Sequence, residues 1–330
     1  MTKSHLLTFE AFPERVLFEG FDEEVLHGLG GFVARVQAGG AKTAAYRVVV
    51  ESGARPRRAA ASGTALKRRP FRRHLTREGE DRIHMPGCTL RLSPGRPEAV
   101  VEFPGDGSDV NGYVLTTQLE MALNHALAMR GFVVTHAASF EVNGTTLLAV
   151  GPTHAGKSTL CGAALAAGGS VVSDDSVILG FDGDKAPSVG ALRRNLWLRE
   201  GSAEILPPEL RSRLKEVVVF GEDRWGLDRG AFAERFRTRV RPDAILLLRR
   251  DRRLRAFQLR ELSAADGLAG ILLASTALFF SSRYRVERDR RLQGLAALVN
   301  SAPCFSLRMG TDLIHESVTT IQNLVAGVRR

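Results

Sequence analysis

The chain has 330 residues, of which 44% are hydrophobic and 25% are charged. This composition is that of a globular protein, so a disordered tail protein and a collagen-like fibre are excluded, and the length predicts about two domains. The longest uncharged apolar stretch, residues 267–282, is shorter than the roughly 20 residues that a membrane crossing needs. It predicts a buried helix and no membrane partner. The first residues carry no export signal, so we expect a cytoplasmic protein.

The net charge is +10, and the basic residues are mostly arginine. Three clusters stand out, at residues 55–77, 249–255 and 283–291. No helix-turn-helix, zinc-finger or RNP motif accompanies them, so the sequence does not favour a nucleic-acid partner. An acidic peptide or a nucleotide accounts for the sign of the charge equally well. The cysteines Cys88, Cys161 and Cys304 lie far apart, which predicts reduced, buried thiols rather than disulfides or a zinc site.

Residues 1–109 are expected to form a strand-rich N-terminal domain. Residues 47–50, 89–92 and 99–103 have strand composition. Between the first two, residues 52–77 hold nine Lys or Arg and no acid, interrupted by prolines and a glycine. This pattern predicts a mobile basic loop with at most one short element. The loop is either a surface insertion without a role or a groove for an acidic partner.

A second domain is expected over residues 110–330, after a glycine-rich change of composition at 104–108. It opens with an amphipathic helix from Val114 to Arg130, which Gly131 ends. Strands at 132–136 and 139–142 follow, and Asn143-Gly144 predicts a hairpin into the apolar strand 145–150. Further strands at 244–248 and 304–309, a helix at 262–280 and a last helix to Val328 complete an α/β fold.

Residues 151–158 read Gly-Pro-Thr-His-Ala-Gly-Lys-Ser and match the pattern G-x-x-x-x-G-K-[ST] between an apolar strand and the predicted helix 159–167. Glycines let successive backbone N–H groups face a phosphate, and a helix N-terminus adds positive partial charge. Lys157 can reach the β- and γ-phosphates, and the Ser158 hydroxyl can bind Mg²⁺. The sequence therefore predicts a site for ATP and Mg²⁺. Its nucleotide-binding residues are Gly151, Pro152, Thr153, His154, Ala155, Gly156, Lys157, Ser158 and Thr159.

Three further side chains are candidates for the chemistry. Asp174 and Asp175 follow the strand-like sequence Val171-Val172-Ser173, which predicts a βαβ unit with both acids at the carboxyl end of a parallel strand beside the loop. One acid can hold Mg²⁺ while the other accepts the proton of an incoming hydroxyl. His136 ends the strand that the Asn143-Gly144 hairpin connects to the loop, so we expect it near the same site.

These residues together resemble the HPr serine kinase/phosphatase family over about residues 110–325. The resemblance is carried by Thr135-His136-Ala137-Ala138, by Asn143-Gly144, by residues 151–158 and by Val172-Ser173-Asp174-Asp175. It implies a P-loop nucleotide-binding core of the HPr kinase and phosphoenolpyruvate carboxykinase type. It also implies that His136 and Asp174 belong to the phosphoryl-transfer site, with Asp174 as the base. Lys157 would hold the phosphates, and Ser158 with Asp175 would serve the metal.

The segment 190–198, Gly-Ala-Leu-Arg-Arg-Asn-Leu-Trp-Leu, departs from the Glu-x-Arg-Gly-rich signature of that family. It looks more like the HPr-kinase-like proteins found beside ribosomally made peptides, such as lasso-peptide kinases. Arg193 and Arg194 are candidates to stabilise charge on the transferring phosphoryl group, or are ordinary surface arginines.

The function expected from the sequence is phosphorylation of a Ser or Thr hydroxyl on a peptide or small protein. Two alternative functions remain: a kinase of a small metabolite such as free serine, and an ATPase or nucleotide-gated binding module. The sequence also leaves open that the protein forms a homo-oligomer.

Overall fold

The computed structural model describes residues 4–9, 11–12, 15–19, 34–38, 46–52, 72–75, 80–85, 87–93, 96–103, 112–181, 187–192, 195–219, 222–251, 253–274 and 285–329. Arg193 and Arg194, most of the expected basic loop (53–71 and 76–77) and residues 275–284 lie outside the described residues. Contacts divide the chain into two units. Unit 1 comprises Met1–Arg130 and Phe280–Arg288, and unit 2 comprises Gly131–Phe279 and Asp289–Arg330.

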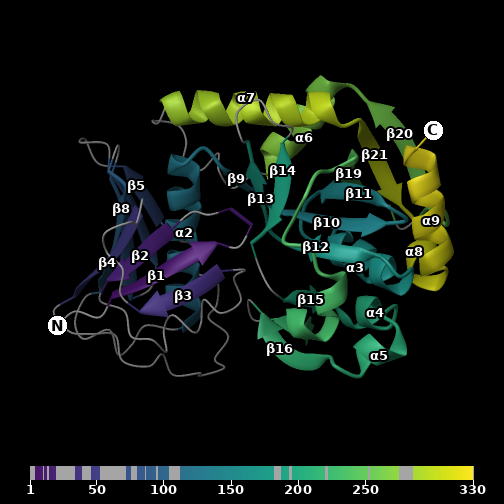
Figure 1. Ribbon diagram of the computed structural model, residues 1–330, viewed down its shortest axis with the longest axis horizontal. Helices are drawn as coiled ribbons and strands as arrows, with labels where there is room; N and C mark the ends of the chain where they lie inside the picture. Colours follow the sequence, from purple (N-terminus) through teal and green to yellow (C-terminus); the bar gives the residue numbers. More distant parts are fainter. Residues whose placement is uncertain are drawn as a thin grey trace. The chain divides into compact units, whose positions relative to one another are not determined.

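Unit 1 is built on an eight-stranded sheet in the order β3-β1-β2-β4-β8-β7-β6-β5 (Figure 1). Its strands β2, β4 and β8 pair in parallel, and the other pairs are antiparallel. The strands are β1 (Ser4–Phe9), β2 (Arg15–Glu19), β3 (Ala34–Ala38), β4 (Tyr46–Ser52), β5 (Arg72–Leu75), β6 (Asp81–Met85), β7 (Cys88–Leu92) and β8 (Glu98–Phe103). The three strands predicted here from composition are confirmed as β4, β7 and β8, and the end of the expected basic loop forms β5.

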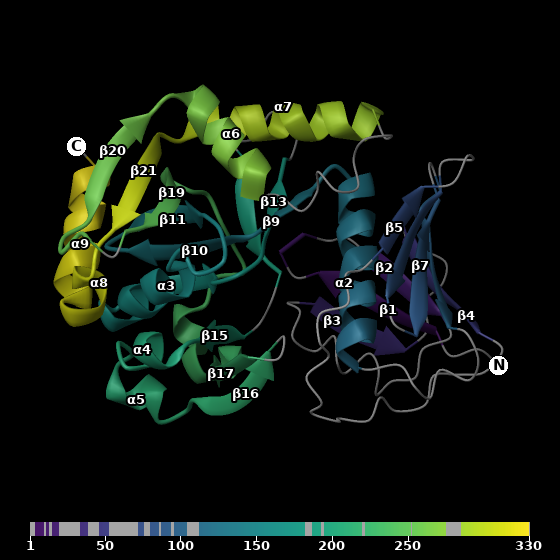
Figure 2. The same ribbon diagram turned by 180° about the vertical axis from the view of Figure 1, so that it is seen from behind.

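Helix α2 (Gly112–Met129) packs against β7 and β8 of this sheet (Figures 1 and 2). The Gln118 side-chain amide donates to the backbone oxygen of Ile83 at 3.1 Å, and Tyr46 hydrogen-bonds to His125 across the core. Gly131 follows the helix with φ of 87°, a left-handed conformation that suits glycine. The predicted helix is therefore present, but its contacts group it with unit 1, so the division falls later than the expected boundary at 109/110.

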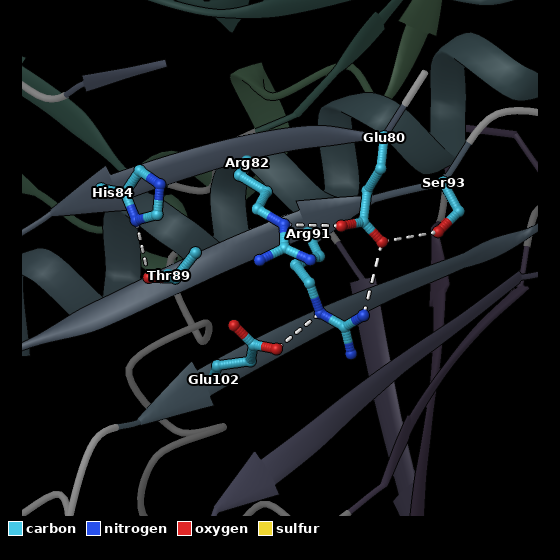
Figure 3. A network of polar contacts seen from close by, with 7 residues as sticks. All are labelled: Glu80, Arg82, His84, Thr89, Arg91, Ser93 and Glu102. Carbon is cyan, nitrogen blue, oxygen red and sulfur yellow. Dashed lines mark hydrogen bonds and ion pairs between the residues drawn. The ribbon is translucent and has the colours of Figure 1, made fainter. Parts of the chain in front are cut away.

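Less buried, mostly polar residues alternate with buried ones along β7 and the first part of β6, as the period of a strand requires. Ile83, Leu90 and Val101 are buried. Arg82 and Arg91, each next in sequence to one of the first two, are paired with each other across β6 and β7. Glu80 contacts both arginines, at 2.7 and 3.4 Å, and Arg91 also reaches Glu102 at 2.6 Å (Figure 3). The same network includes Ser93, which donates to Glu80, and a His84–Thr89 hydrogen bond of 3.0 Å.

Unit 2 is centred on a six-stranded sheet in the order β12-β10-β11-β19-β21-β20. Its strands are β10 (Ala137–Val142), β11 (Thr145–Val150), β12 (Ser170–Ser173), β19 (Ala244–Arg250), β20 (Gln258–Leu262) and β21 (Cys304–Met309). Strands β11, β19 and β21 are parallel neighbours, whereas β10 is antiparallel to both β11 and β12. Asn143 and Gly144 join β10 to β11 with φ of 52° and 73°, which confirms the predicted hairpin.

Two smaller sheets complete unit 2, in the orders β18-β14-β13-β9 and β15-β17-β16. Their strands are β9 (Val133–Thr135), β13 (Val177–Gly180), β14 (Ser188–Ala191), β15 (Leu196–Leu198), β16 (Lys215–Val219), β17 (Glu222–Leu227) and β18 (Arg239–Val240).

The helices of unit 2 include α3, which packs on β10 and β12 and against α9 (Figure 1). They are α3 (Lys157–Ala166), α4 (Glu200–Ala203), α5 (Pro208–Arg211), the 3₁₀ helix η3 (Arg229–Arg235), α6 (Ala264–Ala274), α7 (Arg285–Ser301), α8 (Asp312–His315) and α9 (Ser317–Val328). The first four residues of α7 are grouped with unit 1. The last predicted helix is thus two helices, and the helix expected at 262–280 is described only as α6. In the part of the chain that is described, no helix has the length and apolar character needed to cross a membrane.

The chain passes from one sheet to another at the two places where the sequence predicts reactive residues. His136 separates β9 of the four-stranded sheet from β10 of the six-stranded sheet. Residues 174–176 separate β12 from β13 in the same way, and β13 pairs with β9. The predicted βαβ unit would make β12 a direct parallel neighbour of β11. In the structure the two strands are not neighbours, because β10 lies between them. Both strands nevertheless run in the same direction, so both end at the same edge of the sheet.

Candidate functional site

Residues Gly151–Gly156, here called the glycine loop, connect the carboxyl end of β11 directly to the first turn of α3. Gly156 has φ of 98° and His154 has φ of 68°, both in the left-handed region. This curvature lets α3 begin at Lys157. The first backbone N–H groups of the helix have no helical partners. The loop therefore presents N–H donors and the positive end of a helix at the edge of the sheet.

The two glycines of the motif lie where strands β19 and β21 contact the loop. A Cβ atom on Gly151 would lie 2.9 Å from the Cβ of Leu248, and a Cβ on Gly156 would overlap the Cε of Met309. A side chain at Gly151 would displace the loop from β19, whereas at Gly156 the end of the Met309 side chain could move aside and the left-handed φ of 98° is what requires glycine. The spacing of the motif thus follows from packing as well as from backbone conformation.

Lys157 is buried beneath the loop. Its Nζ donates to the backbone oxygens of Gly151 at 2.8 Å and Pro152 at 2.9 Å. An ammonium group has three N–H donors, so one is left for a further acceptor. Burial lowers the pKa of Lys157 to about 8, although the nearby carboxylates of Asp175 and Asp174 oppose that shift.

Asp174 lies deeper than its neighbour, with 2% of its surface exposed. Its Oδ2 accepts a hydrogen bond of 3.0 Å from the backbone N–H of Trp197, and its carboxyl group also bonds to the Ser158 hydroxyl. Burial, reinforced by the charge of Asp175, raises the pKa of Asp174 to about 7. The buried acid is thus in direct contact with the serine that the motif assigns to a metal.

Asp175 and His136 form the more open part of the site. His136 Nδ1 lies 3.2 Å from Asp175 Oδ1, and the two side chains are 28% and 27% exposed. The Ser176 hydroxyl donates to the other oxygen of Asp175 at 3.1 Å. The Nε2 atom of His136 is buried and has no hydrogen-bond partner among the described residues. A buried imidazole nitrogen without a partner is a departure from the usual pairing of buried polar atoms.

The sequence did not predict three contacts that the structure brings to this edge. The Trp197 backbone N–H binds Asp174, the Thr159 hydroxyl lies 2.8 Å from that of Ser202, and Arg199 reaches His154 at 3.4 Å. All three connect the glycine loop, the first turn of α3 or the acids to residues 197–202. The unusual segment 190–198 was the only signal in the sequence that could have pointed to this region.

The described members of the predicted site are therefore brought together at one sheet edge: the glycine loop, Lys157, Ser158, Asp174, Asp175 and His136. Ser158 and Asp174 offer adjacent oxygen donors, the ligand type that Mg²⁺ prefers. Among the described residues, no group of three or more His, Cys, Asp or Glu side chains is arranged to hold a metal ion.

No protein-family model matches the chain, and no curated protein matches it. Among solved structures, the chain is similar to the HPr(Ser) kinase/phosphatase from Coxiella burnetii, with 10% sequence identity and a TM-score of 0.31. That match covers 60% of this chain and 99% of the other.

Proposed function

We propose that this protein binds ATP with Mg²⁺ at the glycine loop and transfers the γ-phosphoryl group to a Ser or Thr hydroxyl. The observation that carries this proposal is the meeting of an anion-binding loop, a buried lysine and an acid pair at one edge of the sheet. Phosphoryl transfer requires mainly positioning and charge stabilisation, which is what these groups supply.

The loop suits a triphosphate for three reasons. The first N–H groups of α3 have no helical partners, Gly151 and Gly156 let the backbone curl tightly against β19 and β21, and Lys157 has one N–H left to donate. Ser158 and Asp174 are the residues that would hold Mg²⁺. The ion would neutralise charge on the phosphates.

The contacts favour a division of labour between the two acids that is opposite to the one implied by the family resemblance. Asp174 is buried and already bound by Ser158 and Trp197, so an acceptor hydroxyl has little access to it. The Asp175 side chain is more exposed and is oriented by His136 and Ser176. We therefore assign the metal to Asp174 and the base to Asp175.

In this assignment Asp175 takes the proton of the acceptor hydroxyl as the hydroxyl oxygen bonds to the γ-phosphorus. The bond from that phosphorus to the β–γ bridging oxygen breaks, and ADP leaves with the electron pair. His136 holds Asp175 in position through Nδ1. Lys157 offsets the charge that develops on the bridging oxygen.

A peptide or small protein is the acceptor we favour over a small metabolite. The net charge of +10 suits an acidic macromolecular partner, whereas a small neutral metabolite would gain little from it.

Three variants test the function with two measurements, ATP-dependent thermal stabilisation and transfer of label from [γ-³²P]ATP to a Ser-containing peptide. Lys157→Ala should lose the stabilisation, because the loop then lacks its cation. Asp175→Asn should keep most of it and lose transfer by about 10²- to 10⁴-fold, the usual effect of removing a base. Asp174→Asn should instead weaken the Mg²⁺-dependent part of nucleotide binding.

Release of labelled phosphate at an equal rate with and without any acceptor would point to an ATPase instead. If Asp174→Asn and Asp175→Asn show each other's expected behaviour, the roles implied by the resemblance are correct and our assignment is reversed.

A further inference from the structure

An arginine cluster borders the glycine loop and has no part in the proposed chemistry. Strand β19 ends in Arg249 and Arg250, and the turn that follows carries Arg253 and Arg255. Arg308 lies opposite Arg249 in the parallel pairing of β19 with β21. All five residues are exposed. We call this set, Arg249, Arg250, Arg253, Arg255 and Arg308, the arginine edge.

The arginine edge is directly adjacent to the site. Gly151 packs against Leu248, the residue before Arg249, and Gly156 packs against Met309, the residue after Arg308. Arg250 pairs with Met309, and paired residues of neighbouring strands point to the same face of a sheet. Arg250 therefore shares the face on which Met309 meets the glycine loop, whereas Arg249 and Arg308, which pair with each other one position earlier, lie on the other face at the same strand ends. In open α/β sheets this edge, at the carboxyl ends of parallel strands, is where ligands bind.

The positive charge of this surface is largely uncompensated within the part of unit 2 that the structure describes. Arg308 is bound by Asp251 at 2.5 Å and by Gln258 at 2.9 Å. Asp251 also accepts from the backbone N–H of Arg253. Arg249, Arg250 and Arg255 make no side-chain hydrogen bond or ion pair with any described residue. Like charges held this close repel, so an anionic partner that separates or neutralises them is favoured.

We propose that the arginine edge docks an acidic segment of the acceptor polypeptide, next to the hydroxyl that is phosphorylated. This inference rests on the proposed function in one respect, that the acceptor is a polypeptide. Guanidinium groups bind carboxylates through two parallel hydrogen bonds, so a run of Asp or Glu is the matching ligand. Single-stranded nucleic acid would call for aromatic platforms between the cations, and the only aromatic residue from 249 to 260 is the half-buried Phe257.

The test measures binding without catalysis, using the full chain in the absence of nucleotide. The probe is a fluorescein-labelled peptide of one serine followed by a run of glutamates, with its glutamine counterpart as the neutral reference and an oligouridylate as the nucleic-acid arm. Anisotropy should show the glutamate peptide binding, and binding should weaken between about 50 and 300 mM salt as screening increases. The variant Arg249→Ser/Arg250→Ser/Arg255→Ser should bind the peptide about tenfold or more weakly.

A matched control removes the same charge elsewhere in unit 2. Arg237, Arg241 and Arg260 are exposed and lie before β19 or within β20, so their replacement by serine should change peptide affinity by less than about twofold. If the triple variant at the arginine edge does not fold, the single variant Arg255→Ser in the turn serves, with a smaller loss expected.

Three outcomes would overturn the inference. They are absence of peptide binding, equal losses in the edge and control variants, and tighter binding of oligouridylate that depends on the same three arginines. ATP-dependent thermal stabilisation is measured in parallel and should be unchanged in the edge variant. If the parent protein does not bind ATP, the proposed function is contradicted. If it binds ATP but not the peptide, only the docking surface is contradicted.

Discussion

Asp174 combines two properties that oppose each other: it is a carboxyl group in the interior, and it is bonded to groups that favour its charged form. The Trp197 N–H and the Ser158 hydroxyl lower its pKa, but burial and the charge of Asp175 raise the pKa by more, so that it lies at about 7. In the unfolded chain the same group has its ordinary pKa of 3.8. Between these two values the folded protein holds a proton that the unfolded chain has released, so stability falls as pH rises through this window.

Asp174→Asn should therefore stabilise the nucleotide-free protein at neutral and higher pH. Asparagine removes the ionisation and keeps an oxygen to accept from Trp197. The gain should be nearly absent at about pH 3, grow as the pH rises through the two pKa values, and be complete above about pH 7.5, where it amounts to about 1–4 kcal/mol. The measurement is thermal or urea unfolding of parent and variant across this range, in EDTA.

Asp251→Asn provides the contrast, because this half-buried carboxyl group has its pKa lowered by the backbone N–H of Arg253 and by Arg308. Its replacement should cost stability at high pH rather than add it. If the Asp174→Asn variant is less stable than the parent at pH 8, the folded protein stabilises the charged form of Asp174 and the explanation is wrong.

At the scale of elements, strands β6 and β7 place two like charges directly opposite each other. Arg82 and Arg91 are paired in the register, and Glu80 lies between them, in contact with both (Figure 3). Like charges on directly opposed residues destabilise a sheet unless they are neutralised.

Glu80→Gln should lower the stability of unit 1 by about 1 kcal/mol, because Arg82 and Arg91 then face each other without the shared carboxylate, although Arg91 keeps its contact with Glu102. Glu98→Gln is the matched control. Its more exposed carboxylate contacts Arg47 at 3.6 Å, so it should change stability by less than about 0.5 kcal/mol. The measurement is the unfolding midpoint of the parent and of both variants at low and at high salt. A loss that does not shrink as salt screens the arginines would contradict the electrostatic explanation.

The elements that the sequence predicted well are those that local chemistry determines. The Asn143-Gly144 hairpin, the glycine loop and the start of α3 depend on residues next to one another, and each was predicted to within a few positions. The pairing of β12 with β10 rather than with β11 was not predictable, because it depends on contacts between distant segments. The contact of Asp174 with Trp197 escaped for the same reason, and with it the burial that distinguishes Asp174 from Asp175.

At the scale of the whole molecule, the chain contains two units with separate sheets, and every residue of the proposed nucleotide site belongs to unit 2. The core under that site joins β10, β11, β13 and β19 through buried residues such as Ala137, Leu148, Val177 and Ile245. A ligand stabilises the cooperative structure that forms its site, and it does so in proportion to its concentration relative to its dissociation constant.

ATP with Mg²⁺ should therefore slow amide hydrogen exchange in unit 2 and leave the sheet of unit 1 unchanged. The largest protection is expected in peptides covering 151–160, because their N–H groups would contact phosphate directly. Smaller effects should follow at 134–138 and at 172–177, where the chain passes between sheets, and at 195–199, which holds Asp174 through Trp197. Hydrogen exchange read by mass spectrometry, with Lys157→Ala as the control that lacks binding, measures this distribution. Protection of β1 to β8 as strong as that of the glycine loop would mean that the two units respond to nucleotide as one body.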